Sequence, residues 1–383
     1  MPKKAFVKAG FLHYHLLLTD SCNSCCSYCR QKAFNDFEPE GREVKIDEML
    51  PSQLSFGLER LCKFLAKDSE ASLTFYGGEP LLKIPLIEEI MQNAPCKKFM
   101  LQTNGLLLGK LRPEFANRLS TILVSIDGDE RLTDKNRGKG DFRKVIANLK
   151  LLKKNGFSGE LIARMTVTED TDILKQVKFL LKNGFFSFDA VHWQLDANFW
   201  NDFKARPKFR KWLLQDYNPK LRKLANYWVS EMQKKEKVLK LLPFVETMQD
   251  LLLERKSALR CGSGFANFTI QYDGRIIPCP VMVGMKEYYL GSISSVPERL
   301  RRIAPEGECK ECKIIDFCGG RCLYSSIVQP WPVEGRKLVC KSVENLREAM
   351  MEQLPRVKRL LKKGKIMLKD FEHAKYQGPE IIP

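Results

Sequence analysis

Short apolar runs alternate with longer amphipathic segments through the first half of the chain. The apolar runs fit buried strands and occupy residues 11–19, 72–76, 98–102, 121–126, 161–167 and 190–195. Helical periodicity lies between them, over residues 47–66, 142–155 and 172–183. Strands that alternate with helices pair in parallel, so the pattern predicts an α/β fold, either a βα barrel or an open sheet. Six repeats are fewer than a complete eightfold barrel requires.

Glycines and polar residues follow directly after several of these runs, where βα barrels carry their chemistry. They are Gly77, Gly78 and Glu79 after the second run, Asn104 after the third, and Ser125, Asp127 and Arg137 after the fourth. Paired glycines let the backbone approach a ligand closely, and a carboxylate can accept hydrogen bonds from an ammonium group. Taken alone, residues 77–80 or 127–128 also fit ordinary turns. Arg164, in the fifth run, needs a partner because a buried charge is costly.

Three cysteines directly after the first run, Cys22, Cys26 and Cys29, are spaced C-x3-C-x2-C. Soft thiolates are the usual ligands of iron–sulfur clusters, which commonly have four of them. A three-cysteine loop therefore leaves one iron free to bind another molecule. The alternative is zinc, because Cys25 completes two adjacent C-x2-C pairs and zinc accepts four thiolates. Zinc ribbons, however, separate their two pairs by a dozen or more residues.

The cysteine loop, with Tyr28 just before its last cysteine, resembles the radical S-adenosylmethionine (SAM) superfamily. The resemblance implies a partial (βα)6 barrel and a [4Fe–4S] cluster whose open iron is chelated by SAM. Electron transfer from the cluster then splits SAM into methionine and a 5′-deoxyadenosyl radical. Residues 77–80 match the family's GGEP motif, and the Ser-x-Asp-Gly and Asp-x-x-Arg stretches match its peptide-modifying branch. By this resemblance the SAM-binding residues are Tyr28, Gly77, Gly78, Glu79, Asn104, Ser125, Asp127, Arg137 and Arg164.

Seven further cysteines follow in the last third of the chain. Their spacing is C-x12-G-x4-C, then C-x2-C-x5-C-x3-C and a final cysteine, and it resembles the SPASM domain of radical SAM enzymes that modify ribosomally made peptides and proteins. The resemblance implies two auxiliary [4Fe–4S] clusters. The first would be held by Cys261, Cys279 and Cys322, and the second by Cys309, Cys312, Cys318 and Cys340. Since the first set has three cysteines, we expect an open iron or a non-cysteine ligand there.

One position departs from the sulfatase-maturating relatives of this family. In those enzymes an aspartate follows the cysteine of the G-x4-C stretch and acts as a base, whereas here Pro280 follows Cys279. Proline cannot accept a proton, so formylglycine formation by the same base is disfavoured. Three cysteines, Cys25, Cys62 and Cys96, are left without an expected ligand role.

Charge and composition set the expected environment. The chain carries 64 basic and 46 acidic residues, a net charge of +18, and 13 cysteines at metal-ligand spacings. Clustered cysteines indicate metal sites in a reducing compartment, and no signal peptide or membrane-length apolar run is found, so we expect a cytoplasmic protein. Residues 200–258 mix 14 basic and 7 acidic residues with many aromatics. We expect amphipathic helices there, although such a mixture also fits a surface that grips an acidic peptide or a nucleic acid.

Together these patterns predict four regions. Residues 1–195 form the partial barrel, 196–258 a basic helical insert, 259–342 the SPASM domain and 343–383 a helical tail. The 21 residues before Cys22 leave no room for an N-terminal peptide-recognition domain.

The expected function is hydrogen abstraction from a peptide or protein, which installs a cross-link, an oxidation or an epimerisation. Ferredoxin or flavodoxin is the expected electron donor, because the catalytic cluster must be reduced at low potential. The alternatives are a sulfatase-type maturase, an RNA-modifying enzyme and a non-enzymatic electron carrier.

Overall fold

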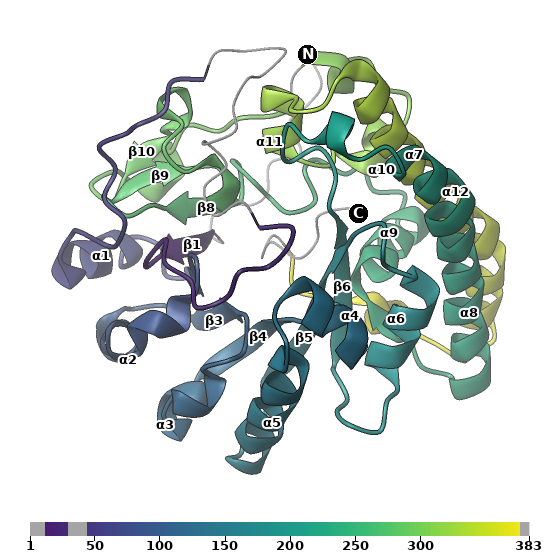
Figure 1. Cartoon of the computed structure of the whole chain (residues 1–383), viewed down its shortest axis with the longest axis horizontal. Helices are drawn as coiled ribbons and strands as arrows, with labels where there is room; N and C mark the ends of the chain where they lie inside the picture. The colour runs from purple at the N-terminus through teal and green to yellow at the C-terminus, as the bar shows by residue number, and fades with distance from the viewer. Residues whose placement is uncertain (1–11, 30–43, 306, 376–382) are drawn as a thin grey trace.

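A computed structural model describes residues 12–29, 44–305, 307–375 and 383 of the chain (Figure 1). Six parallel strands form the centre of its sheet: β1 (His13–Leu17), β2 (Ser72–Tyr76), β3 (Lys98–Thr103), β4 (Leu119–Ser125), β5 (Glu160–Val167) and β6 (Ala190–Leu195). They lie side by side in sequence order. This is the partial barrel that the sequence predicted, and each strand lies within two residues of its expected bounds.

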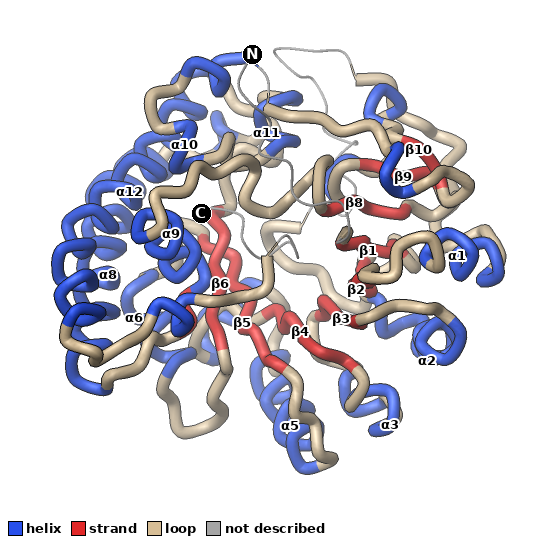
Figure 2. Tube along the Cα trace, turned by 180° about the vertical axis from the view of Figure 1, so that it is seen from behind, coloured by secondary structure: helices blue, strands red, loops and turns tan. Residues whose placement is uncertain are grey.

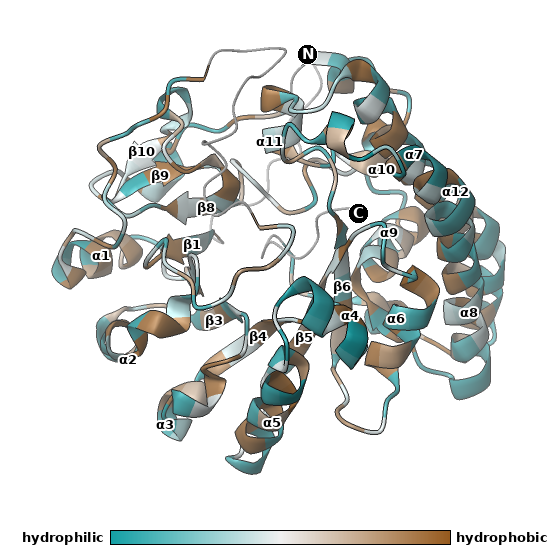
Figure 3. Ribbon diagram, in the orientation of Figure 1, coloured by the Kyte–Doolittle hydropathy of each residue, from teal (hydrophilic) through white to brown (hydrophobic). Residues whose placement is uncertain are grey.

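Helices cover the outer face of this curved sheet (Figure 2). They are α1 (Leu58–Leu65), α2 (Ile84–Asn93), α3 (Pro113–Ala116), α4 (Glu130–Asn136), α5 (Asp141–Lys154) and α6 (Ile173–Leu181). Asp129 and Asp172 begin α4 and α6 by accepting hydrogen bonds from backbone N–H groups of the first turn, as N-cap residues do. Hydropathy separates the two faces of helices such as α5, whose apolar side chains contact the strands (Figure 3).

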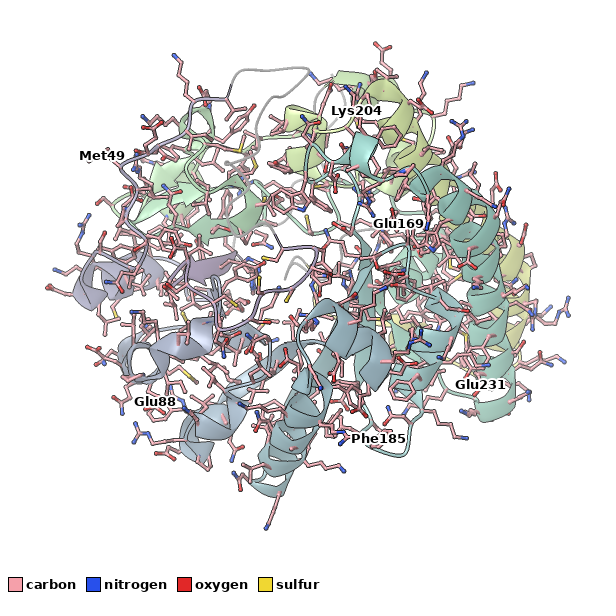
Figure 4. All side chains as sticks on the ribbon, in the orientation of Figure 1. Met49, Glu88, Glu169, Phe185, Lys204 and Glu231 are labelled. Carbon is pink, nitrogen blue, oxygen red and sulfur yellow. The ribbon has the colours of Figure 1, made fainter. Side chains whose placement is uncertain are left out.

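The helix expected over residues 47–66 is wrong in its first half, since α1 begins only at Leu58. Pro51 lacks an N–H group, and the backbone around it pairs with the segment after β1 instead of with itself. The Leu54 N–H donates to the Leu18 carbonyl at 3.0 Å, and the Asp20 N–H donates to the Ser52 carbonyl at 2.9 Å. Met49, counted among the apolar helix positions, is 89% exposed and points outward (Figure 4).

The insert is helical, with α7 (Phe209–Trp212), α8 (Asn218–Lys235), the short strand β7 (Lys240–Leu241) and α9 (Leu242–Leu252). Most of its large aromatic side chains are buried, among them Phe209, Trp212, Tyr217 and Trp228, whereas Trp200, Phe203 and Tyr227 are partly exposed. Packing explains the buried rings, which cannot stack on a nucleic acid. The helix α8 lies along α12 (Val333–Lys362), to which Arg222 donates hydrogen bonds.

The cysteine-rich region joins the same sheet. Its strands β8 (Asn267–Ile270), β9 (Arg275–Ile277) and β10 (Gly291–Ser292) extend the sheet beyond β1, with β8 parallel to β1 and β9 antiparallel to β8. Two short helices follow, α10 (Ile315–Cys318) and α11 (Leu323–Val328). The helix α12 then runs through residue 342, so the domain limits stay a prediction from the sequence. In the described part of the chain, no helix is both long and apolar enough to cross a membrane.

Candidate active site

The cysteine loop follows β1 and lies over the ends of the neighbouring strands. After β2, the N–H groups of Gly78 and Glu79 donate to the carbonyls of Thr19 and Ser21 at 2.8 and 2.9 Å. After β3, the Asn104 Nδ2 donates to Asn23 at 2.8 Å and lies 3.9 Å from the Cys22 sulfur. Hydrogen bonds to the end of α4 complete the docking, from Ser27 N to Asn136 O and from Ser24 Oγ to Arg137 O. The loop is thus held in place by three separate segments.

A cavity of about 350 Å³ opens between this loop and the inside of the barrel. Eleven residues predicted to bind the cluster or SAM line it: Cys22, Cys26, Tyr28, Cys29, Gly77, Gly78, Glu79, Asn104, Ser125, Arg137 and Arg164. Its other wall comes from distant segments, with Trp200, Tyr272, Pro280, Val281 and Val283. Of the residues predicted for SAM, Asp127 is the one that does not line the cavity, and it is fully buried behind it.

Gly77 and Gly78 are needed for contact with the protein's own backbone. A Cβ atom on Gly78 would lie 2.3 Å from the Ser21 carbonyl oxygen and 2.4 Å from that of Asp20. A Cβ atom on Gly77 would lie 2.4 Å from the Thr19 oxygen, and its φ of +145° favours glycine. The glycines therefore let the strand end pack against residues 19–21, which lead into the cysteine loop. They place the loop as well as line the cavity.

Glu79 is buried and anchors the turn after β3. Its carboxylate accepts hydrogen bonds from Thr103 Oγ1 at 2.7 Å, from the Asn104 N–H at 2.8 Å and from the Leu81 N–H at 3.0 Å. Burial raises the pKa of Glu79, and these hydrogen bonds oppose the rise. Its edge still lines the cavity, so an ammonium group could be accepted there in addition.

Asp127 gathers the donors around Tyr28 and Arg137. It accepts from Arg137 Nε at 3.1 Å and Nη2 at 2.9 Å, from Tyr28 Oη at 3.0 Å, from Asn136 Nδ2 at 3.2 Å and from the Thr166 N–H at 3.0 Å. Burial lowers the pKa of Arg137, but Asp127, Tyr28 and Cys26 together outweigh the burial and raise that pKa above its usual value. Arg137 therefore reaches the cavity with its charge already balanced.

Arg164 faces the same cavity with neutral partners. Its Nη1 lies 2.9 Å from His192 Nδ1 and its Nη2 donates to Gln194 at 2.7 Å, while no carboxylate among the described residues pairs with it. Ser125, Arg164 and His192 are register neighbours on β4, β5 and β6, so they form one row across the barrel. Burial lowers the pKa of Arg164, and the nearby charge of Arg137 lowers it further. The cavity thus contains a cation suited to an anionic group.

The later cysteines come from separate elements and fall into two groups. Burial raises the pKa of Cys279 to about 12, and Cys322 is the next cause. Burial likewise raises the pKa values of Cys309 and Cys318 to about 11, with Cys340 contributing to both and Cys312 to Cys309. These groups match the two sets expected from the spacing, although their ligand role stays a prediction. Cys261, of the first expected set, lies near enough to Arg164 to raise the pKa of that arginine, against the larger lowering by burial.

Two observations test whether these residues fit the expected groups. Within residues 12–29, 44–305 and 307–375, no three Cys, His, Asp or Glu side chains converge closely enough for a single metal ion. Compact zinc sites are therefore not preformed there, whereas a cubane cluster spreads its ligands more widely. In addition, the buried Arg321 beside Cys322 has two nitrogens without a partner, as expected if negative charge belongs beside it. The residues fit iron–sulfur clusters.

Reasoning from the sequence missed part of the cavity wall. Trp200 and Tyr272 line the cavity but follow no motif. Asn23 and Asn136 were not predicted either, yet Asn23 accepts a hydrogen bond from Asn104 and Asn136 donates one to Asp127. The signal for Trp200 was weak because aromatic residues are frequent throughout its segment.

The radical SAM superfamily matches this chain over residues 16–173, the stretch that carries the cysteine loop and the row of strand-end residues. The chain contains a radical SAM domain. Radical SAM domains use a [4Fe–4S] cluster and SAM.

Relatives match different parts of the chain. GTP 3′,8-cyclase of Clostridium perfringens is 32% identical over 119 residues, which span 30% of this chain and about a third (34%) of that relative. The radical SAM cyclopropyl synthase TigE of Paramaledivibacter caminithermalis is 21% identical over 340 residues, or 80% of this chain and 67% of that protein.

Solved structures share the fold over most of the chain. The structure of anSMEcpe with bound AdoMet has a TM-score of 0.68 at 19% identity and covers 91% of this chain and all of that one. Streptococcus suis SuiB has a TM-score of 0.50 at 16% identity and covers 82% of this chain and 73% of that one. At these identities the likeness shows the fold, which includes the cysteine-rich region.

Proposed function

We propose that this radical SAM enzyme abstracts hydrogen from a peptide or protein and installs a post-translational modification. The observation that carries the proposal is the shared cavity. Pro280, Val281 and Val283, which follow directly after Cys279, face the loop of Cys22–Cys29 across it. A substrate in this cavity would touch both the SAM site and the first group of later cysteines.

Cys22, Cys26 and Cys29, all of which line the cavity, would hold the catalytic cluster. When bound, the cluster and SAM together supply a radical that removes hydrogen from the substrate. The chain's own part is positioning. Asn104 steadies Cys22, and the backbone of Gly78 and Glu79 fixes the entry to the loop.

The polar groups of the cavity suit the ends of SAM. Glu79 and the strand end at Gly78 would accept the amino group, while the hydroxyl of Ser125 suits a ribose. Arg137 and Arg164 are the two guanidinium groups available for a carboxylate. Since Asp127 already balances Arg137, Arg164 has more to gain from an anion in the cavity.

The later cysteines would hold auxiliary clusters that take up the electron left after hydrogen abstraction. A net oxidation needs such an acceptor, and a low-potential donor such as ferredoxin or flavodoxin would reduce the catalytic cluster. Solved structures of anSMEcpe include one with AdoMet and the Cp18Cys peptide, and SuiB has been solved with its precursor peptide SuiA. The fold shared with anSMEcpe supports a peptide as the substrate class.

Pro280 argues against a sulfatase-type maturase. It lines the cavity at the position where that class is expected to carry an aspartate base, and proline offers no proton acceptor. The proposed modification of the substrate is therefore a cross-link, another oxidation or an epimerisation.

Anaerobic reconstitution with iron and sulfide tests the proposal. With SAM and dithionite, the protein should release 5′-deoxyadenosine, and short peptides encoded beside its gene should raise the yield. Mass spectrometry should show these peptides losing hydrogen for a cross-link or oxidation, or gaining deuterium from D2O for an epimerisation. If no 5′-deoxyadenosine forms, the proposal that this protein is a radical SAM enzyme fails. If it forms but no encoded peptide or protein is altered, the proposed substrate class fails and the SAM chemistry stands.

A further inference from the structure

The turn between Cys318 and Cys322 holds a buried arginine in an unusual backbone conformation. Gly319, Gly320 and Arg321 have consecutive φ values of +69°, +89° and +48°. Glycine adopts this region readily but arginine rarely does, and such outliers concentrate at functional sites. The turn is tightly packed, since a Cβ atom on Gly320 would lie 2.5 Å from a Pro305 side-chain atom and one on Gly319 would lie 2.8 Å from the Leu259 nitrogen.

This backbone aims the Arg321 side chain into the protein, where it is 7% exposed. Its Nη2 makes a long hydrogen bond of 3.4 Å to the Leu195 carbonyl at the end of β6, and its guanidinium lies 5.6 Å from the centre of the Phe199 ring. Its Nε and Nη1 atoms have no hydrogen-bond partner in the described structure. No carboxylate among those residues forms an ion pair with it either.

Two other arginines that are largely shielded from solvent, Arg260 and Arg206, have carboxylate partners, whereas Arg164 has none but bonds His192 and Gln194 at ordinary distances. Arg260 is buried to a similar degree, yet it bonds Asp250 at 2.7 Å and the Phe317 carbonyl. Arg206 is surrounded by Glu169, Asp196 and Asp202. A buried cation without such compensation is costly, so the negative charge that balances Arg321 should come from something bound beside it.

Cysteines of both predicted sets flank Arg321 in the chain, with Cys318 three residues before it and Cys322 directly after it. Cys322 belongs to the first expected auxiliary cluster, and Cys318 and Cys340 belong to the second. Arg321 therefore lies between the two sets, next in sequence to a ligand of the first.

We propose that Arg321 is a positioning residue for both auxiliary clusters, whose negative charge its guanidinium balances and whose reduction it favours. The inference rests on the auxiliary clusters of the proposed function. Reduction adds one electron to a cluster, taken from the substrate radical in turnover or from dithionite in a titration. A cation beside the cluster stabilises the added charge and raises the potential, because charge and hydrogen bonds around the sulfurs set cluster potentials.

The test compares Arg321→Gln and Arg321→Lys with the wild type, all reconstituted as full chains. Iron and sulfide content establish cluster occupancy, and a redox titration followed by electron paramagnetic resonance gives the potential of each cluster. We expect Arg321→Gln to shift the reduction equilibrium of at least one auxiliary cluster tenfold or more toward the oxidised form, about 59 mV for one electron. Arg321→Lys should restore most of the shift, and the cluster at Cys22–Cys29 should not move.

Arg118→Gln is the matched control, since it removes the same charge at an exposed position far along the sheet, and it should leave all potentials unchanged. If fully loaded Arg321→Gln has wild-type potentials, the inference is overturned. If Arg321→Gln loses auxiliary iron but Arg321→Lys retains it, the result supports the role of the charge. If both variants lose auxiliary iron, Arg321 acts by packing and the inference is overturned. A wild type without auxiliary clusters overturns the proposed clusters themselves, which iron analysis shows before any titration.

Discussion

The two cysteine regions of this protein place the same ligand atoms in different surroundings. Cys22 and Cys29 are exposed on one short loop at the cavity, and its arginine, Arg137, is neutralised by Asp127. The later cysteines are spread over loops and the helices α10 to α12, and their arginine, Arg321, has no such partner. One site is preorganised by hydrogen bonds and leaves room for a ligand. The other contains a buried guanidinium with two nitrogens that have no hydrogen-bond partner among the described residues.

The largest expected effect is the loss of the exposed site. Cys26→Ser should remove about four irons per chain and abolish SAM cleavage, because a thiolate ligand is lost from a three-thiolate set. Iron analysis and chromatographic detection of 5′-deoxyadenosine measure both. Cys25→Ser is the matched control on the same loop and should keep the cluster and the cleavage activity. Loss of both would make Cys25 a cluster ligand and contradict the three-cysteine assignment.

The second region should respond differently to the same change. Cys318→Ser should lose only its auxiliary cluster and lower the thermal midpoint, since Cys318 neighbours cysteines on other elements and metal ligation there supports folding. Substrate-independent SAM cleavage should persist. Simultaneous loss of the catalytic cluster would show that the two regions do not fold as separate metal sites.

Asp127→Asn should lower the free energy of unfolding of the protein by about 3–5 kcal/mol, because it leaves the buried Arg137 without its counter-charge. Thermal or denaturant unfolding measures the change. Asp170→Asn is the control, since its ion pair with Lys135 is exposed and is expected to contribute at most about 1 kcal/mol. Equal effects would mean that Asp127 does not stabilise the loop.

Gly78→Ala should cost about 1–3 kcal/mol, because the new Cβ atom would press on the backbone oxygens of Asp20 and Ser21. Weaker cluster retention should accompany it, since these residues lead into the cysteine loop. Gly57→Ala has open space and an ordinary φ of −71°, so it should be close to neutral. A neutral Gly78→Ala would show that the loop can shift freely.

The smallest effect on stability is expected for Arg164→Gln, within about 1 kcal/mol, because no carboxylate is left behind. The affinity of the Arg164→Gln variant for SAM or for an anionic substrate should nevertheless fall. Equilibrium dialysis measures the affinity for SAM. Marked destabilisation would contradict the view that its charge is reserved for a bound anion.

Much of the fold could be predicted from the sequence because each buried strand is a local apolar run. The order of strand-end residues likewise brought the expected SAM contacts to one cavity. The helix over residues 47–57 failed because Pro51 and pairing with residues 18–20 override local periodicity. Asp127 accepts hydrogen bonds from Tyr28, 99 residues away in the sequence, and from Thr166, 39 residues away. No local sequence pattern encodes such contacts.

The parallel pairing of β8 with β1 has a further consequence. The Asn267 side chain bonds His15 at 2.9 Å, and the His13 N–H donates to the Ala266 carbonyl at 3.0 Å. The strand that leads into the cysteine loop is therefore an inner strand only while the C-terminal half is present. A chain truncated after residue 258 would expose β1 as an unprotected edge, and such edges promote aggregation. The barrel should therefore not survive as an independent module without the strand that pairs with β1 from the C-terminal half.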